Sequence, residues 1–108
     1  MKAAAESFLR CTNAFAVDGA LRLFTPDAII DDVSVGDAFV GAKGIRRYLE
    51  QFFVGYKTAS TVLSIQQLDA RKTVARVDFT GDFGHEIGVL KFAVNADGFI
   101  ERIDADLE

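Results

Sequence analysis

The sequence predicts an α+β fold in which three N-terminal helices pack on a strongly curved, mostly antiparallel sheet and form a cup. Three observations carry this prediction. Apolar residues recur at helical spacing near the N-terminus, a second such stripe follows Gly41, and the second half of the chain consists of strand-like runs separated by short turns. Helices on one side of a bent antiparallel sheet can enclose a pocket. We therefore expect a cone-shaped site for a small molecule.

The first helical segment is defined by Phe8, Cys11 and Phe15, which fall at positions i, i+3 and i+7. This spacing predicts a surface helix with one buried stripe. Gly19 breaks the pattern, and a shorter helical piece ends before Pro26, because the residue that precedes a proline disfavours the helical conformation. Two helices therefore precede the first strand.

A strand pair and the third helix follow. Residues 27–33 are rich in β-branched side chains, and the segment 39–40 is expected to return after a turn at 36–37. From Gly41 onward, apolar side chains recur at helical spacing up to Gly55, which we expect to end the helix. The apolar stripe of this helix comprises Ile45, Tyr48, Leu49, Phe52, Phe53 and Tyr56.

The remaining half of the chain reads as four strands, at about 58–69, 72–83, 87–95 and 98–107. The turns between them are expected at 70–71, 84–86 and 96–98. Connections this short join antiparallel neighbours. The chain has 108 residues, which is the size of one domain, so we expect residues 1–108 to form a single unit.

Composition and charge exclude several classes of function. The net charge is -4 and the basic residues form no stripe, so a nucleic-acid partner is not expected. The chain holds one cysteine, Cys11, and one histidine, His85, which are too few for a zinc site. The carboxylates lack the spacing of a calcium loop. We expect neither a metal nor another cofactor.

No targeting or membrane segment is predicted. Charges at Lys2 and Glu6 interrupt the N-terminal segment before an apolar core of the signal-peptide type can form. The longest uncharged stretch, 58–68, is far shorter than the ~20 residues that cross a bilayer. We therefore expect a cytoplasmic protein without a membrane partner.

Four segments, in this order and spacing, carry a resemblance: Phe24-Thr-Pro-Asp27-Ala-Ile-Ile-Asp31-Asp32, Gly41-Ala-Lys-Gly44-Ile45-Arg46, Thr80-Gly81-Asp82-Phe83-Gly84 and Asp97-Gly98-Phe99-Ile100. Through them residues 8–107 resemble the nuclear-transport-factor-2-like superfamily, in particular its branch of SnoaL-like polyketide cyclases and ketosteroid isomerases. The resemblance implies a cone of the cystatin-like α+β barrel type. Members of the superfamily include enzymes, noncatalytic binders and assembly modules, so the fold alone does not settle the function.

The resemblance makes Asp32 the first catalytic candidate. Aligned from the first helix, Asp32 falls where ketosteroid isomerases have their general-base aspartate, at the pocket end of the first strand. Burial in an apolar cup raises the pKa of a carboxylic acid toward the range in which its anion takes a proton from carbon. The alternative is a strand-end carboxylate bound by a turn amide or an arginine.

The same alignment argues against a true ketosteroid isomerase. Phe8 stands where that family has its oxyanion-hole tyrosine, and Leu90 stands where it has its protonated aspartic acid. Neither side chain can donate a hydrogen bond, whereas the two donors of the family stabilise the dienolate. Migration of a steroid double bond is therefore not expected.

A second catalytic candidate is the pair Arg76 and Asp78, which lie two residues apart on a predicted strand and therefore share a face. Enzymes that resemble limonene-epoxide hydrolase carry an Arg-x-Asp at a similar place. They complete the set with an aspartate on the last strand, where this chain has Ala105. We assign Arg76 and Asp78 to orienting the ligand or a water molecule.

Periodicity offers a competing interpretation of this pair. Val77, Phe79 and Phe83 form the apolar face of the strand, which would turn Arg76 and Asp78 toward solvent as an ordinary surface pair. Both interpretations hold only if the apolar face is the convex side of the sheet and a second subunit covers it. On that basis we expect a homodimer through the outer sheet face.

Two functions fit these features of the sequence. One is a SnoaL-like small-molecule enzyme, a cofactor-independent isomerase, cyclase or hydrolase with Asp32 as its base; the other is a noncatalytic ligand-binding or dimerisation module of the same fold. Both would hold an apolar ligand in the cup. The candidate lining residues, for which plain core packing is the alternative, are Phe8, Phe15, Phe24, Ile30, Phe52, Phe53 and Leu90.

Overall fold

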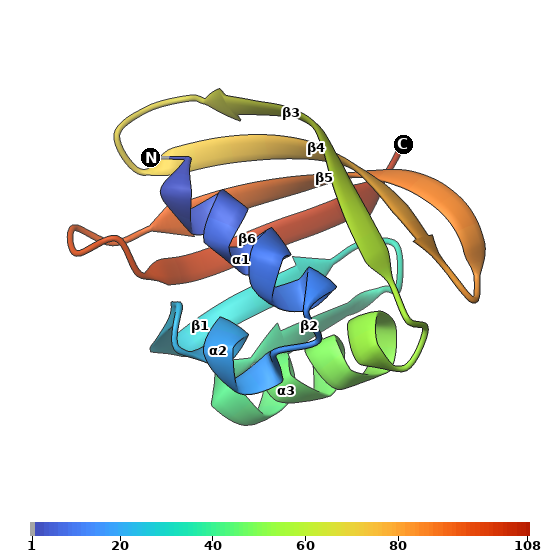
Figure 1. The fold of residues 1–108 in the computed structure, drawn as a ribbon. Helices are drawn as coiled ribbons and strands as arrows, with labels where there is room; N and C mark the ends of the chain where they lie inside the picture. The colour runs from blue at the N-terminus through green and yellow to red at the C-terminus, as the bar shows by residue number, and fades with distance from the viewer. Residues whose placement is uncertain (1) are drawn as a thin grey trace.

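The fold is seen in a computed structural model that describes residues 2–108 (Figure 1). Its helices are α1 (Ala3–Asn13), α2 (Val17–Leu21) and α3 (Gly41–Leu49), which continues into the π-helical turn η1 (Glu50–Val54). Its strands are β1 (Phe24–Asp32), β2 (Asp37–Val40), β3 (Ala59–Gln67), β4 (Lys72–Gly81), β5 (Gly84–Val94) and β6 (Ile100–Leu107).

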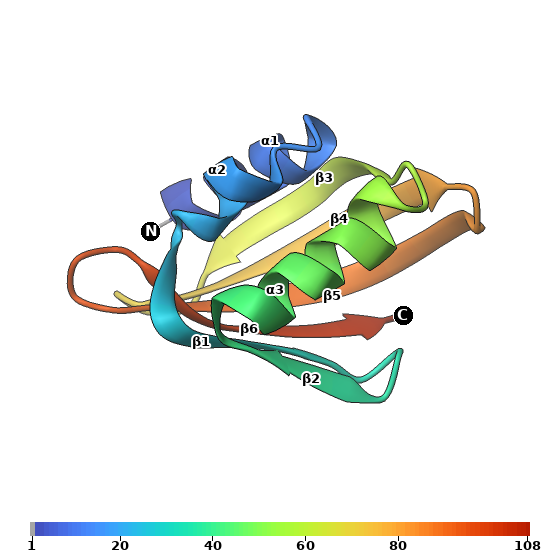
Figure 2. The same cartoon turned by 90° about the horizontal axis from the view of Figure 1, so that it is seen from below.

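The six strands form one curved sheet in the order β2-β1-β6-β5-β4-β3. All neighbours are antiparallel except β1 and β6, which run parallel. The sheet stays open, since β2 and β3 at its two edges do not pair with each other. All three helices lie on one side of it, as Figure 2 shows. The predicted α+β cup is therefore confirmed.

Helix α1 buries a stripe that is displaced from the predicted one, since its buried residues are Ala5, Phe8, Leu9 and Thr12. Its buried side chains include Phe8 and Thr12, whereas Cys11 is only half-buried. The helix ends at Asn13, and Phe15 takes a left-handed backbone conformation with a φ of 54°. Phe15 is 44% exposed as a result. The helical spacing from Phe8 to Phe15 therefore does not continue through the end of the helix.

Phe8 lies at the centre of the hydrophobic core and is 1% exposed. Its ring meets the rings of Phe24, Phe53 and Phe92 edge-on, with centroids 5.9, 6.2 and 5.6 Å apart. Edge-to-face pairs at these distances are favourable beyond the area they bury. Helix α1, strand β1, turn η1 and strand β5 are therefore held together at one point, which closes the narrow end of the cup.

The edge of the sheet at β3 is joined to α1 through one side chain. Asn13 donates from Nδ2 to the carbonyl oxygen of Ser60 at 2.9 Å, and its Oδ1 accepts from the amide of Ser60 at 2.7 Å. The amide group of Asn13 thus replaces the neighbouring strand that an edge strand lacks. This contact holds the C-terminal end of α1 over the sheet.

The hairpin between β4 and β5 is tighter than predicted. Gly81 pairs directly with Gly84, so the turn is only Asp82 and Phe83, and the expected turn at residues 84–86 is wrong. Gly84 has a φ of 108°, a conformation that favours glycine. A Cβ on Gly81 would lie 2.7 Å from the carbonyl oxygen of Tyr56. Because the turn has only two residues, strand β5 begins at Gly84 and includes His85 and Glu86.

Candidate functional site

A cavity of about 290 Å³ opens at the wide end of the cup, between α3 with η1 and the ends of β1, β4, β5 and β6. Volumes of this order suit a small organic molecule. The lining combines aromatic rings with a few polar groups: Asp32, Ser34, Val35, Tyr48, Phe52, Phe53, Tyr56, Thr58, Phe79, Phe83, Glu86 and Leu107.

Asp32 is the buried carboxylate of this cavity, with an exposed fraction of 6%. It is the last residue of β1. Its Oδ1 accepts hydrogen bonds from the backbone amide of Ser34, at 3.0 Å, and from the hydroxyl of Ser34. This local turn is one that Asp side chains commonly stabilise. The second oxygen, Oδ2, accepts from the hydroxyl of Tyr48 at 2.7 Å. Three donors thus fix the direction of the carboxylate.

Tyr48 reaches Asp32 from the buried face of α3. Burial, followed by the negative charge of Asp32 and the hydrogen bond to it, raises the pKa of the Tyr48 hydroxyl well above its ordinary value. The phenol therefore stays protonated across the physiological range and acts as a permanent donor to Oδ2. Two carboxylate oxygens offer about four acceptor positions, so one position of Asp32 stays open.

The wider turn at η1 places consecutive aromatic residues on the cavity. Phe52 and Phe53 both contribute to its wall, although a regular helix would separate neighbours by about 100°. The ring of Phe52 contacts the ring of Tyr48 on one side, at 5.2 Å, and that of Tyr56 on the other, at 6.1 Å. Tyr56 in turn meets Phe83 edge-on. Single π-helical turns of this kind occur frequently at functional sites.

Four of the predicted lining residues lie in the packed core rather than on this cavity. They are Phe8, Phe24, Ile30 and Leu90, with exposed fractions between 0 and 9%. They fill the narrow end of the cup as part of the cluster of buried apolar side chains. Of the predicted lining, Phe52 and Phe53 are the residues that the structure places at the cavity.

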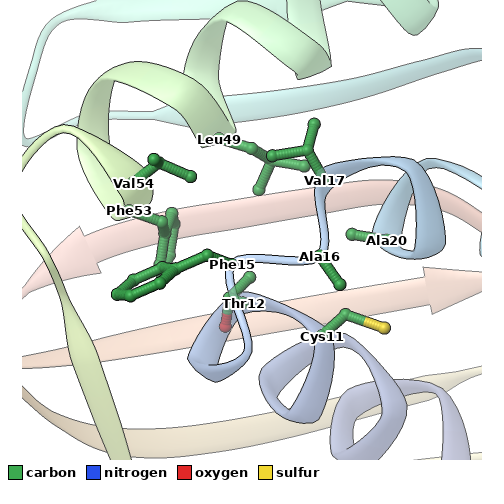
Figure 3. A pocket seen from close by; sticks show the side chains of 9 residues that line it. All are labelled: Cys11, Thr12, Phe15, Ala16, Val17, Ala20, Leu49, Phe53 and Val54. Carbon is green, nitrogen blue, oxygen red and sulfur yellow. The ribbon is translucent and has the colours of Figure 1, made fainter.

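Phe15 lies elsewhere, in an apolar crevice between the end of α1, the start of α2 and η1 (Figure 3). The crevice has about 10 Å³ of space, which is roughly what one water molecule needs. Cys11 also lies on its wall. This crevice is a packing gap between helices and has no room for an organic ligand.

Arg76 and Asp78 are not brought to the cavity. They lie on the outer face of β4, because Ala75 and Val77 point to the helices and are fully buried. Arg76 binds the carboxylate of Glu108 through two nitrogens, with one contact of 2.8 Å. Since both groups are exposed, this pair contributes little to stability.

Asp78 approaches a different partner on the outer face. Its Oδ1 lies 2.6 Å from Nε2 of His85, although the two groups lack the geometry of a hydrogen bond. His85 belongs to strand β5, although the sequence predicts a turn at residues 84–86. Arg76 and Asp78 therefore belong to two separate surface pairs, and neither lies beside Asp32.

The apolar face of β4 is also the inner face, which corrects the expectation of a convex apolar surface. Val77 is fully buried within the chain, and Phe79 faces the cavity. Phe83 lies at the cavity wall with 38% of its surface exposed. None of these residues needs a second subunit to cover it, so this particular reason for a homodimer is removed.

The contact that the sequence did not reveal is the one between Tyr48 and Asp32. Tyr48 belongs to the apolar stripe of α3 and looks like any other core aromatic in the sequence. One signal was present: a buried tyrosine hydroxyl requires a partner. Glu86 was missed for another reason, because residues 84–86 were expected to form a turn.

Metal and membrane features are not found in the part of the chain that the structure describes. Among residues 2–108, no group of three or more histidine, cysteine, aspartate or glutamate side chains is arranged to hold a metal ion. Within the same residues, no helix has the length and apolar character needed to span a membrane.

Comparison with protein families gives one match, in which the model of the SnoaL-like domain covers residues 5–103. Comparison with curated proteins gives no significant match.

Solved structures with the same fold include both an enzyme and binders. The epoxide hydrolase/cyclase-like enzyme SalBIII, involved in pyran ring formation in salinomycin, is 19% identical with a TM-score of 0.86, over 99% of this chain and 89% of its own. RV0760c from Mycobacterium tuberculosis, in complex with estradiol-17beta-hemisuccinate, is 18% identical with a TM-score of 0.83, over 94% and 88%. A computationally designed 17-OHP binder is 19% identical with a TM-score of 0.84, over 94% and 88%. At these identities the likeness establishes the fold.

Proposed function

Because this chain belongs to the SnoaL-like domain family, we propose that its cavity binds an apolar small molecule and that Asp32 moves a proton on it. The reaction would be an isomerisation, cyclisation or hydrolysis in which protein side chains do the proton transfer. One observation carries the proposal: the carboxylate of Asp32 is buried on the wall of a cavity of about 290 Å³ and is held there by Tyr48.

In this mechanism Asp32 is the general base. The acceptor position that Ser34 and Tyr48 leave open receives the proton from the substrate. Tyr48 is a positioning residue, because its hydroxyl is committed to Oδ2 and keeps the carboxylate in one orientation. Holding a base in a fixed geometry lowers the barrier of proton transfer.

Tyr56 is the donor that we assign to the oxygen of the substrate. Its ring lines the cavity, and its hydroxyl makes no hydrogen bond to any residue in 2–108. A free phenol can stabilise the negative charge that develops on a carbonyl oxygen when a neighbouring carbon loses its proton. This role replaces the two donors that Phe8 and Leu90 cannot provide. Arg76 and Asp78 take no part, since they lie on the outer face.

The test uses a general carbon acid in place of the unidentified substrate. 2-Tetralone, an apolar bicyclic ketone, is incubated with the protein in D₂O, and deuterium incorporation next to its carbonyl is followed by NMR. We expect the protein to accelerate exchange beyond an equal concentration of acetate, and Asp32→Asn to abolish the acceleration. Asp31→Asn is the matched control, because Asp31 is the adjacent residue but pairs with Arg102 on the outer face.

The alternative function is a noncatalytic binding module. The three hydrogen bonds that Asp32 accepts favour it, because a carboxylate so well satisfied is also a good structural element at the end of a strand. A protein that binds 2-tetralone without accelerating its exchange, and in which Asp32→Asn leaves binding unchanged, would support this alternative.

We also propose that the chain forms a homodimer through the outer sheet face. The support is a set of half-buried apolar side chains among the surface charges of that face, which includes Ile29, Val74, Ile87, Val89 and Ala93. Light scattering tests this directly, since a monomeric mass at micromolar concentration would contradict it.

A further inference from the structure

We infer that the cavity prefers an apolar molecule that carries a basic nitrogen over a similar molecule that carries a negative charge. The carboxylate of Glu86 is the group that makes this distinction, because it pairs with the protonated nitrogen. This inference rests on the proposed function, because it names the class of molecule that the same cavity accepts.

The charges that line the cavity have one sign. Among the described residues, Asp32 and Glu86 are the carboxylates that line it, and no lysine, arginine or histidine does. The remaining polar lining consists of the hydroxyl groups of Ser34, Tyr48, Tyr56 and Thr58. An anionic ligand would enter a partly desolvated space with two carboxylates and no opposite charge, which is costly.

The two carboxylates differ in what they already bind. Asp32 is buried and already accepts three hydrogen bonds, and its one remaining acceptor position is the one that the proposed proton transfer uses. The side chain of Glu86 has no hydrogen bond and no ion pair with any residue in 2–108. Of the two, only Glu86 is available to pair with a charge that the ligand brings.

The strand register explains why Glu86 faces the cavity. Glu86 pairs with Phe79 across the ladder between β4 and β5, so the two side chains share a face. The preceding residue, His85, points to the other face and meets Asp78. Glu86 is exposed to solvent, which puts its carboxylate at the mouth, whereas Asp32 and its partner Tyr48 are buried.

A ring system with a protonated amine matches this arrangement. Its apolar body would pack on Phe52, Tyr56, Phe79 and Phe83, and its ammonium group would approach Glu86 at the mouth. Aromatic faces attract cations as well, and this effect adds to the attraction by the carboxylate. A neutral analogue would keep the apolar contacts and lose only the charge pairing.

The experiment compares three naphthalene derivatives that differ in charge: 1-naphthylmethylamine, 1-naphthylmethanol and 1-naphthylacetate. Their affinities are measured at neutral pH by displacement of the fluorescent probe N-phenyl-1-naphthylamine. We expect the amine to bind best and the acid worst, with an amine-to-acid ratio of about tenfold or more. Because Glu86 is exposed, Glu86→Gln should lower this ratio by roughly fivefold, with little change for the neutral alcohol.

Glu101→Gln is the matched control. It removes the same charge from an exposed position on β6, but it lies six residues before Leu107, which lines the cavity, and thus about 20 Å away along the strand. The ratio in Glu101→Gln should equal that of the wild type. An unchanged ratio in Glu86→Gln, or equal binding of amine and acid by the wild type, overturns the inference and leaves the proposed function standing. Failure of the folded wild type to bind the neutral probe and the alcohol overturns the proposed function, and the inference with it.

Discussion

The hydroxyl of Tyr48 lies 2.7 Å from Oδ2 of Asp32, across 16 residues of sequence, and joins helix α3 to the last residue of strand β1. Both side chains are buried. The pair therefore serves two purposes at once: it fastens the third helix over the sheet, and it sets the orientation of the carboxylate on the cavity wall. For a substitution at either residue, the free energy of unfolding and the affinity for a ligand should therefore be measured separately.

Replacing Tyr48 with phenylalanine should destabilise the protein by about 1–3 kcal/mol, because Oδ2 of Asp32 loses its donor while it stays buried. Chemical denaturation measures the change in the free energy of unfolding. Tyr56→Phe is the control, since Tyr56 is 40% exposed and its hydroxyl has no partner within residues 2–108. Equal stability of the two variants would contradict the hydrogen bond.

The raised pKa of Tyr48 predicts a loss of stability in alkaline solution. Its ordinary value is 10.0, and burial followed by the charge of Asp32 raises the folded-state pKa well above that. The stabilising effect is fully present below the unfolded value. Above about pH 10 the unfolded chain ionises first, so the free energy of unfolding falls as the pH rises toward the folded-state pKa. Tyr48→Phe lacks this dependence, so the stability difference between wild type and variant should narrow from about pH 9 to about pH 11.

Truncation of Phe8 to alanine should cost about 3–5 kcal/mol, because it leaves a hole where three aromatic rings meet. Thermal or chemical denaturation detects the change. Phe99→Ala serves as the comparison, since Phe99 is 46% exposed and should change stability by about 0.5 kcal/mol or less. A small effect at Phe8 would show that the narrow end of the cup is not the packed core.

Asn13→Ala should destabilise the protein by about 1–2 kcal/mol through the loss of both hydrogen bonds to Ser60. Amide hydrogen exchange gives a more local readout. The amide of Ser60 should exchange faster in the variant, whereas amides in the centre of β5 should keep their relative protection. Unchanged protection at Ser60 would mean that Asn13 does not hold the edge of the sheet.

Most of the fold was predictable from local patterns. The four C-terminal strands lie within two or three residues of their predicted bounds, because alternation of apolar side chains and short polar turns are strong signals in this half of the chain. The third helix was equally clear from its apolar stripe. The turn between β4 and β5 was expected too late, because turn-favouring residues stand on both sides of Phe83, with Asp82 before it and Gly84 after it.

The site was less accessible to sequence reasoning than the fold. Asp32 was selected by position within a resembling family, and the structure places it at the cavity. The sequence could not tell which face of β4 points inward, since an apolar face can be turned to a core or to a partner. The orientation of β4 determines whether Arg76 and Asp78 lie at the cavity or on the outer face of the sheet. Long-range contacts such as the one between Tyr48 and Asp32 depend on how α3 crosses β1. No local sequence pattern predicts that crossing.

The division of the cup into a filled end and an open end bears on how this chain can change over evolutionary time. Residues such as Phe8, Ile30 and Phe92 keep the molecule folded, whereas Tyr56, Phe83 and Glu86 contribute to the wall of the open end. Apart from Tyr48 and Phe53, which belong to both sets, substitutions in the second group need not destabilise the first. New ligand preferences can thus arise on this scaffold, or be engineered into it, by exchanging a few side chains at the rim.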